Sequence, residues 1–149
     1  MKKLSMGELR RKLQMLKKPV LQKETKEIIL QDKEIVRRKK AEFKGGTRPD
    51  GTIIGEYRSE SYRLFKLQKN PLAGGKVDLI LTGSTKDKLY LVSLENGEFT
   101  FESADPKWAS LVEKYGEEVK GINANVFRGL QQTRYAPDLV DRMKQITGL

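Results

Sequence analysis

The stretch Val77–Ser103, VDLILTGSTKDKLYLVSLENGEFTFES, decides the fold, because it holds the densest run of β-forming residues and the clearest turn in the chain. Two extended segments flank Asn96-Gly97, the dipeptide best suited to a two-residue type I′ turn, in which both residues have positive φ. We therefore predict a hairpin over residues 88–103. A third antiparallel strand is expected at Val77–Leu81, where apolar and polar residues alternate before Gly83.

The alternation along the hairpin predicts a sheet with one apolar face. Leu89 and Leu91 share one side of the first strand, and Phe99 and Phe101 alternate with polar residues on the second. An apolar face must be covered, and only the helices before and after the sheet can cover it.

A long helix is expected over residues 20–44, which contain no Gly or Pro. Leu21, Ile28 and Ile35 recur at every seventh position and mark an apolar stripe. This spacing fits a helix lying across a sheet or a coiled coil, and we favour the first because the heptads are too few for the second. The basic residues expected on the outer face are Lys23, Lys26, Lys33, Arg37, Arg38, Lys39 and Lys40.

Shorter helices are predicted from their capping residues. Ser5 and Glu8 have capping-box spacing, so a short helix should run to about Lys18, with Pro19 ending it or opening the next. The other predicted starts are Ser59 before Glu60, Asp105 as N-cap before Pro106, and Pro137 after a loop over residues 123–132. Trp108 is the largest side chain available for the core.

These elements predict an α+β fold, with the long N-terminal helix packed across a small antiparallel sheet and further helices toward the C-terminus. The chain has 149 residues, enough for one domain with a real core. We expect a basic N-terminal extension or short helix over residues 1–19, followed by a single α+β structural domain over residues 20–149.

The composition provides little for catalysis. There is no His and no Cys, which removes the commonest general base and metal ligand and the thiolate nucleophile. We therefore expect no enzyme, no catalytic or metal-ligating residue and no cofactor. Carboxylate pairs such as Glu117-Glu118 and Asp138/Asp141 leave a metal-dependent nuclease open as an alternative.

The composition also suggests where the protein works. The chain is 37% hydrophobic and 34% charged, which favours an elongated or oligomeric protein. No run approaches the about 20 apolar residues of a membrane span. The N-terminus does not fit a signal peptide, because Glu8, Arg10 and Arg11 stand where an apolar core would be. We expect an intracellular protein without membrane contact.

The net charge of +10 is concentrated near the N-terminus. Residues 1–44 hold 15 Lys and Arg against 6 Asp and Glu, which leaves a net charge of only +1 for residues 45–149. Such asymmetry suggests an electrostatic partner, although a solvated helix face explains it too. The predicted contacts to phosphate or to an acidic surface are Arg37, Arg38, Lys39 and Lys40, which near a helix C-terminus also favour the helix dipole.

The order of elements resembles the virion-morphogenesis and tail-completion proteins of tailed bacteriophages, which sit at the head–tail junction. The resemblance spans roughly residues 20–147. The segments that carry it are the Phe-x-Gly-Gly-x-x-Pro-x-Gly loop at Phe43–Gly51, the polar segment Tyr57–Lys66, the Leu-Thr-Gly of Ile80–Gly83, and Trp108-Ala109 leading to Tyr115-Gly116.

The resemblance implies a non-enzymatic structural subunit of the virion, a connector, neck or tail-completion protein. Such a subunit forms a homo-oligomeric ring and docks to portal, neck or tail proteins. In such a ring, the basic N-terminal third is expected to face either packaged DNA, which it would contact non-specifically, or an acidic portal surface. A strand edge at Val77–Leu81 or Phe99–Phe101 is the expected contact surface. The alternative is a small basic nucleic-acid-binding protein.

Overall fold

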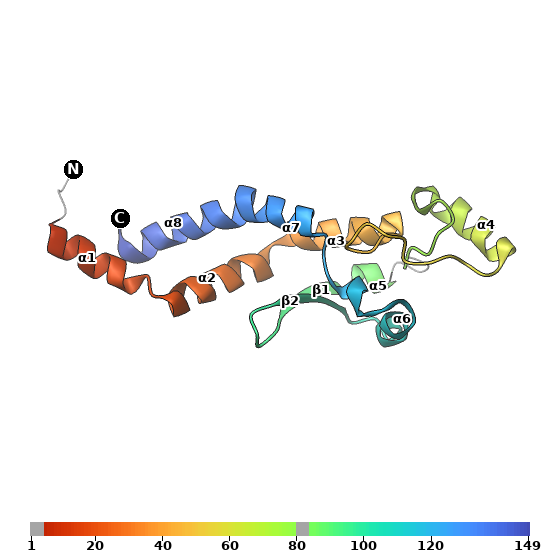
Figure 1. Cartoon of the computed structure of the whole chain (residues 1–149), viewed down its shortest axis with the longest axis horizontal. Coiled ribbons are helices and arrows are strands. Elements are labelled where there is room, and N and C mark those ends of the chain that lie inside the picture. The colour runs from red at the N-terminus through yellow and green to blue at the C-terminus, as the bar shows by residue number, and fades with distance from the viewer. Residues whose placement is uncertain (1–4, 80–83) are drawn as a thin grey trace. The chain divides into compact units, whose positions relative to one another are not determined.

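The structure, a computed structural model, describes residues 5–79 and 84–149 and has the expected α+β composition (Figure 1). The chain forms two compact units: Met1–Asp32 with Gly129–Leu149, called unit 1 here, and Lys33–Arg128, called unit 2. The division between the two units falls after Asp32 and after Arg128. The expected boundary at residue 19 between an extension and a single domain stays a prediction. N-terminal and C-terminal segments share unit 1.

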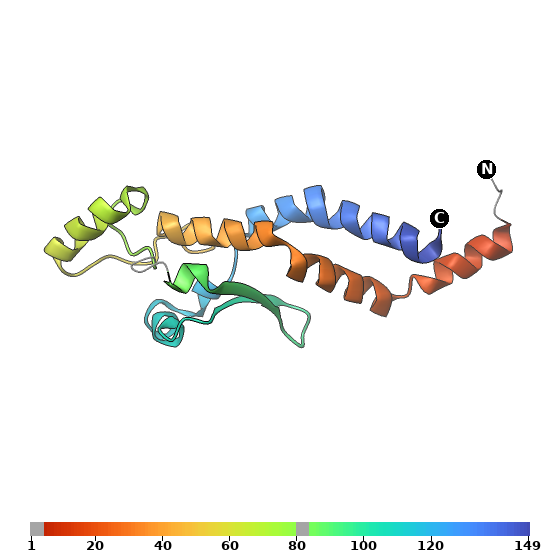
Figure 2. The same cartoon turned by 180° about the vertical axis from the view of Figure 1, so that it is seen from behind.

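Unit 1 consists of helices that pack along one another. Its elements are α1 (Met6–Met15), α2 (Lys18–Gln31) and α8 (Ala136–Thr147), with α8 reached through α7 (Ala124–Leu130) and the π-helical turn η3 (Gln131–Tyr135). The helix α8 contacts both α1 and α2 and runs beside α2 in both views (Figures 1 and 2). The buried apolar side chains of this unit are Ile28, Ile29, Leu130, Tyr135 and Met143.

The predicted start of α1 is confirmed. The backbone N–H of Ser5 donates to Oε2 of Glu8 at 2.9 Å, and the N–H of Glu8 donates to Oγ of Ser5 at 3.2 Å. This reciprocal capping satisfies two backbone donors that a helix start leaves free. Pro19 lies in the first turn of α2, where its missing N–H costs nothing.

The single helix expected over residues 20–44 is wrong, because the chain leaves helical geometry at Asp32. This residue has φ −76° and ψ 109° and separates α2 from α3 (Lys33–Gly45). Its buried carboxylate accepts hydrogen bonds from Arg134 Nη2 at 3.0 Å and from the Tyr135 hydroxyl at 2.8 Å. Partners about 100 positions away in the sequence therefore hold the break, and a local pattern could not reveal them.

The loop expected over residues 123–132 is also wrong. Asn123 caps α7, because its Oδ1 accepts from the N–H groups of Asn125 at 2.9 Å and Val126 at 3.2 Å. The helical path continues through η3 into α8 despite Pro137. Proline has no N–H, and its ring crowds the carbonyl four residues earlier, so the wider π turn lets the chain remain helical.

Unit 2 combines the hairpin with short helices and irregular segments. Its further elements are α4 (Glu60–Lys69), η1 (Pro71–Ala73), α5 (Ser84–Asp87), β1 (Leu89–Ser93), β2 (Phe99–Ser103), α6 (Trp108–Tyr115) and η2 (Glu117–Lys120). Ser59 caps α4 as predicted, with its Oγ accepting from the N–H of Tyr62. The predicted helix after Asp105 begins at Trp108, and the Asp105 carboxylate accepts from the N–H of Lys107 at 2.9 Å.

The predicted hairpin is confirmed, with β1 and β2 antiparallel and Leu91 opposite Phe101. Leu89 and Phe101 are buried, so the expected face points into the core. The helix α3 contacts β1, and Phe43 of α3 packs against Trp108 with 6.1 Å between ring centroids. The second half of the expected long helix thus reaches the sheet, while α2 belongs to unit 1.

The predicted type I′ turn is wrong. Leu94 and Glu98 pair, since the N–H of Leu94 donates to the Glu98 carbonyl at 2.8 Å, which leaves a three-residue loop. The N–H of Gly97 donates to the Leu94 carbonyl at 3.0 Å, and within this loop only Gly97 has positive φ, at 83°. This is the pattern of a type I turn followed by a glycine bulge. Asn96 instead accepts the N–H of Glu98 at 3.0 Å through its side chain.

The strand expected at Val77–Leu81 is not found in the described part of that segment. Residues 77–79 form no ladder, and Leu79 has a φ of 51°, which strands do not allow. Residues 80–83, including the rest of that strand, lie outside the described residues. Two isolated bridges, Thr47 with Ile53 and Glu56 with Lys76, hold the neighbouring irregular chain in place.

A substitution at the hairpin loop tests its geometry. Gly97→Ala should destabilise unit 2 by about 1–2 kcal/mol, because an L-residue resists the left-handed conformation. Space is not the cause, since no atom lies within 4 Å of the position of an added Cβ. Gly45→Ala, at the end of α3, is the matched control and should lose no stability. Urea unfolding followed by Trp108 fluorescence measures both, and equal stabilities would contradict the assigned turn.

Candidate functional site

The structure places the four predicted contact residues in different environments. Arg37 and Arg38 have side chains that are 65% and 50% exposed, and Lys40 is half-buried. Lys39 is fully buried, so its predicted place on the outer face is wrong. Of the four, Arg37, Arg38 and Lys40 can meet a ligand that approaches α3, and their contact with phosphate or an acidic surface stays a prediction.

Both exposed arginines are engaged by Glu34, one turn earlier on α3. Arg37 donates to Glu34 through Nε and Nη2, each at 2.6 Å, and Arg38 donates through Nε at 2.8 Å. These hydrogen bonds lower the pKa of Glu34 to about 2, so its carboxylate stays ionised at neutral pH. An external anion must therefore compete with Glu34 for these guanidinium groups.

Lys39 forms a buried ion pair inside unit 2. Its Nζ lies 3.0 Å from Oε2 of Glu42 and 4.8 Å and 5.8 Å from the ring centroids of Phe43 and Phe101. Glu42 also accepts the backbone N–H of Asn123 at 2.9 Å. Burial lowers the pKa of Lys39, and Glu42 opposes that shift. Through these contacts, the ion pair on α3 connects to Phe101 of β2 and to Asn123 at the start of α7.

Sequence spacing contained a signal for this burial. Ile35, Lys39 and Phe43 are four residues apart and occupy the same face of a helix, and all three are buried. The basic run from Arg37 to Lys40 obscured it, because consecutive charges suggest a common surface. Helical periodicity instead sends every fourth residue to the core side.

A second buried charge cluster lies around Asp78. Lys66 Nζ contacts Asp78 Oδ1 at 2.5 Å, with side chains only 3% and 1% exposed. Asn70 Nδ2 donates to Asp78 Oδ2 at 2.9 Å and to the Lys44 carbonyl at 2.8 Å, and the Tyr57 hydroxyl donates to Oδ1 at 3.4 Å. Burial and the nearby carboxylate raise the pKa of Tyr57. This cluster ties α4 to the chain before α5 and was not predicted.

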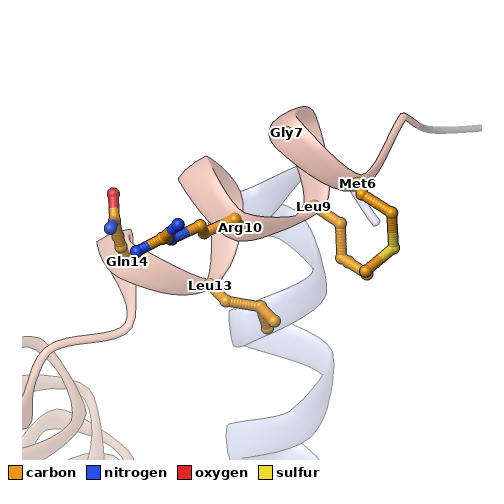
Figure 3. Close-up of a pocket in the computed structure, with 6 residues that line it drawn as sticks. All are labelled: Met6, Gly7, Leu9, Arg10, Leu13 and Gln14. Atoms are coloured by element: carbon orange, nitrogen blue, oxygen red, sulfur yellow. The ribbon is translucent and has the colours of Figure 1, made fainter.

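Unit 1 leaves an apolar surface on α1. Along Met6–Met15 no residue is fully buried, although the spacing is amphipathic. Met6, Leu9 and Leu13 project from one side of α1 and line an open groove together with Arg10 (Figure 3). Met6 is 81% exposed and Leu13 is 52% exposed. A contiguous apolar patch of this kind is a candidate surface for association with another molecule.

Across residues 5–79 and 84–149, no three His, Cys, Asp or Glu side chains come together as metal ligands would. Within the same residues, no helix combines the length and apolar character that crossing a bilayer requires. Comparison of the chain with protein-family models, with curated proteins and with solved structures finds no match in any of the three.

Removing one partner of the buried pair should test its role in stability. Glu42→Gln should cost about 3–5 kcal/mol, because it leaves the Lys39 ammonium buried without a counter-charge. Lys39→Met should cost less, because the Glu42 carboxylate that it leaves unpaired is 11% exposed and still accepts the N–H of Asn123, and because methionine can pack against Phe43 and Phe101. Glu34→Gln is the control and should cost much less than Glu42→Gln, because the partners of Glu34, Arg37 and Arg38, are exposed to water. Urea unfolding in which Glu42→Gln and Glu34→Gln are equally stable would contradict this role.

The lowered pKa of Lys39 predicts that the stability of the protein depends on pH. Because burial lowers the pKa of Lys39 below its usual 10.5, the unfolded chain binds this proton more tightly than the folded chain does. Stability must then rise as pH increases toward 10.5, where the unfolded group also loses its proton. The free energy of unfolding of the natural chain, minus that of Lys39→Met, should therefore increase with pH. A difference that falls or stays constant in alkaline urea titrations would disprove it.

Proposed function

We propose that this chain is a structural subunit of a tailed-bacteriophage virion, placed at the head–tail junction as a connector, neck or tail-completion protein. It assembles into a homo-oligomeric ring and docks to portal, neck or tail proteins. The observation that carries the proposal is the apolar surface that unit 1 leaves in water. A neighbouring subunit covering that surface supplies stability that the isolated unit lacks.

The exposed apolar residues are spread over the helices of unit 1. On α1 they are Met6, Leu13 and Met15, on α2 Leu30, and on α8 and just beyond it Val140, Ile146 and Leu149. Scattered single residues of this kind are ordinary, but repeated ones on two adjacent helices form surfaces suited to association.

The resemblance to tail-completion proteins is the reason for proposing a phage virion as the assembly to which the chain belongs. Tyr57 and Lys66, which bound one of its segments, meet at Asp78, directly before another of its segments, Ile80–Gly83. Ile80–Gly83 itself lies outside the described residues. The Phe43–Gly51 segment runs from the end of α3 into a turn. Phe43, where the first segment begins, packs against Trp108 of the last with 6.1 Å between their ring centroids, so residues of two of the four segments meet in unit 2.

The hairpin provides a further surface for assembly. In the described residues the sheet has two strands, so each strand pairs with a partner on one side only. A strand edge can accept a strand or an extended segment from a neighbouring subunit. This supports docking by strand addition at Phe99–Phe101, one of the two edges predicted from the sequence.

Localisation in particles tests the proposal. Purified virions should contain the chain in multiple copies, visible by quantitative mass spectrometry, and labelling should place it at the head–tail junction in electron micrographs. The purified chain should form a closed oligomer in mass photometry. A stable monomer at every concentration that is also absent from particles would refute the proposal.

Binding to nucleic acid is the second candidate, and the exposed guanidinium groups of Arg37 and Arg38 favour it. Replacing both with Ala should lower affinity for duplex DNA and reduce the dependence of log K on log salt by about 1–2. Glu34→Gln should raise affinity, because it releases both arginines. Arg63→Ala is the control, since Arg63 is a partly exposed arginine that pairs with Glu60 on α4. A salt dependence unchanged by all these variants would eliminate this candidate.

A further inference from the structure

We propose that the α1 groove of one copy receives α8 of the next copy, so that subunits join head to tail through unit 1. This inference rests on the proposed ring and names the contact that would build it. The α1 face is defined as Met6, Leu9, Arg10 and Leu13. The α8 face is defined as Pro137, Asp138, Val140 and Asp141.

The α1 face is apolar with a basic edge. Met6, Leu9 and Leu13 follow the i, i+3, i+7 spacing of one helical stripe, and Arg10, which extends toward Gln14 in Figure 3, also lines the groove. The only acid on α1, Glu8, is engaged by Ser5 in the helix cap. The α1 surface therefore selects an apolar partner that carries negative charge.

The α8 face has the complementary chemistry. Val140 is 52% exposed, and Pro137 beside it is exposed as well. Asp138 and Asp141 flank them. The Asp141 side chain is 70% exposed, and its Oδ1 lies 3.4 Å from Nζ of Lys144, which is exposed as well. An incoming Arg10 can thus pair with Asp141, while Leu13 and Val140 bury each other.

The α1 face and the α8 face of one copy do not pack against each other. Inside unit 1, α1 already packs on α8, and Lys12 Nζ donates to the Gly148 carbonyl at 2.9 Å. That contact uses the α8 end at Gly148, beyond the exposed Val140. Each copy therefore presents two different free faces, and contacts between unlike faces generate rings or filaments rather than isolated pairs.

Single-face variants of the full chain test this arrangement. Leu13→Ser and Val140→Ser should each weaken self-association by about tenfold or more in sedimentation, because each removes a buried apolar contact. The controls are Leu64→Ser and Leu72→Ser, which alter exposed leucines of unit 2, 46% and 69% exposed, that lie in neither face. These controls should assemble normally. Circular dichroism checks that all four variants are folded.

Mixing and charge exchange make the test specific for unlike faces. Leu13→Ser mixed with Val140→Ser should yield pairs, since each variant retains the face that the other lacks. Arg10→Asp and Asp141→Arg should each weaken assembly, and the double variant should restore it. Assembly that is insensitive to these changes, or a double variant no better than either single variant, would overturn the proposed contact.

Other occupants of the α1 groove give different results. If Leu13→Ser leaves assembly intact but abolishes binding to phosphatidylglycerol vesicles, the groove faces a membrane and the inference is wrong. If the variant assembles normally but is lost from virions, the groove holds another virion protein and the inference is again wrong. In that second case the proposed function survives, whereas a chain absent from particles refutes the function itself.

Discussion

The buried pairing of Lys39 with Glu42 is the constraint on which unit 2 depends. An ammonium group that is removed from water and placed near two phenylalanine rings needs a counter-charge at contact distance, and Glu42 lies 3.0 Å away. Glu42 in turn receives the N–H of Asn123, the residue that caps α7. Because one carboxylate serves both partners, the position of α3 fixes the start of α7, and Phe101 brings the hairpin to the same place.

A second charged cluster, around Asp78, fixes the irregular part of unit 2 in the same way. Asp78 collects donors from Tyr57, Lys66 and Asn70, so chain segments without regular backbone pairing still acquire fixed positions. In unit 1 the corresponding anchor is Asp32, which is held by Arg134 and Tyr135 where α2 ends. All three clusters use charge inside the fold. The contrast with the apolar side chains left outside on α1 and α8 underlies the proposed assembly role.

Local patterns predicted what depends on neighbours in the sequence. The Ser5 capping box, the cap at Ser59 and the alternating faces of the hairpin all follow from contacts within a few residues, and all are found. Predictions failed where contacts with residues distant in the sequence decide the local structure. The break at Asp32 requires Arg134, and the hidden position of Lys39 requires Glu42 and Phe101. At the hairpin loop, the Asn96 side chain forms its own turn and displaces the expected backbone geometry.

By itself, the sequence determined the α+β composition, the hairpin with its buried face, and the absence of His and Cys, since residue type and spacing suffice for these. Only the tertiary structure decided which charged residues are buried and where the chain divides. The physical reason is that a buried charge is stable only beside its partner, and partners such as Asp32 and Tyr135 come together only on folding. The sequence placed Arg37 through Lys40 in one group, and folding separated Lys39 from it.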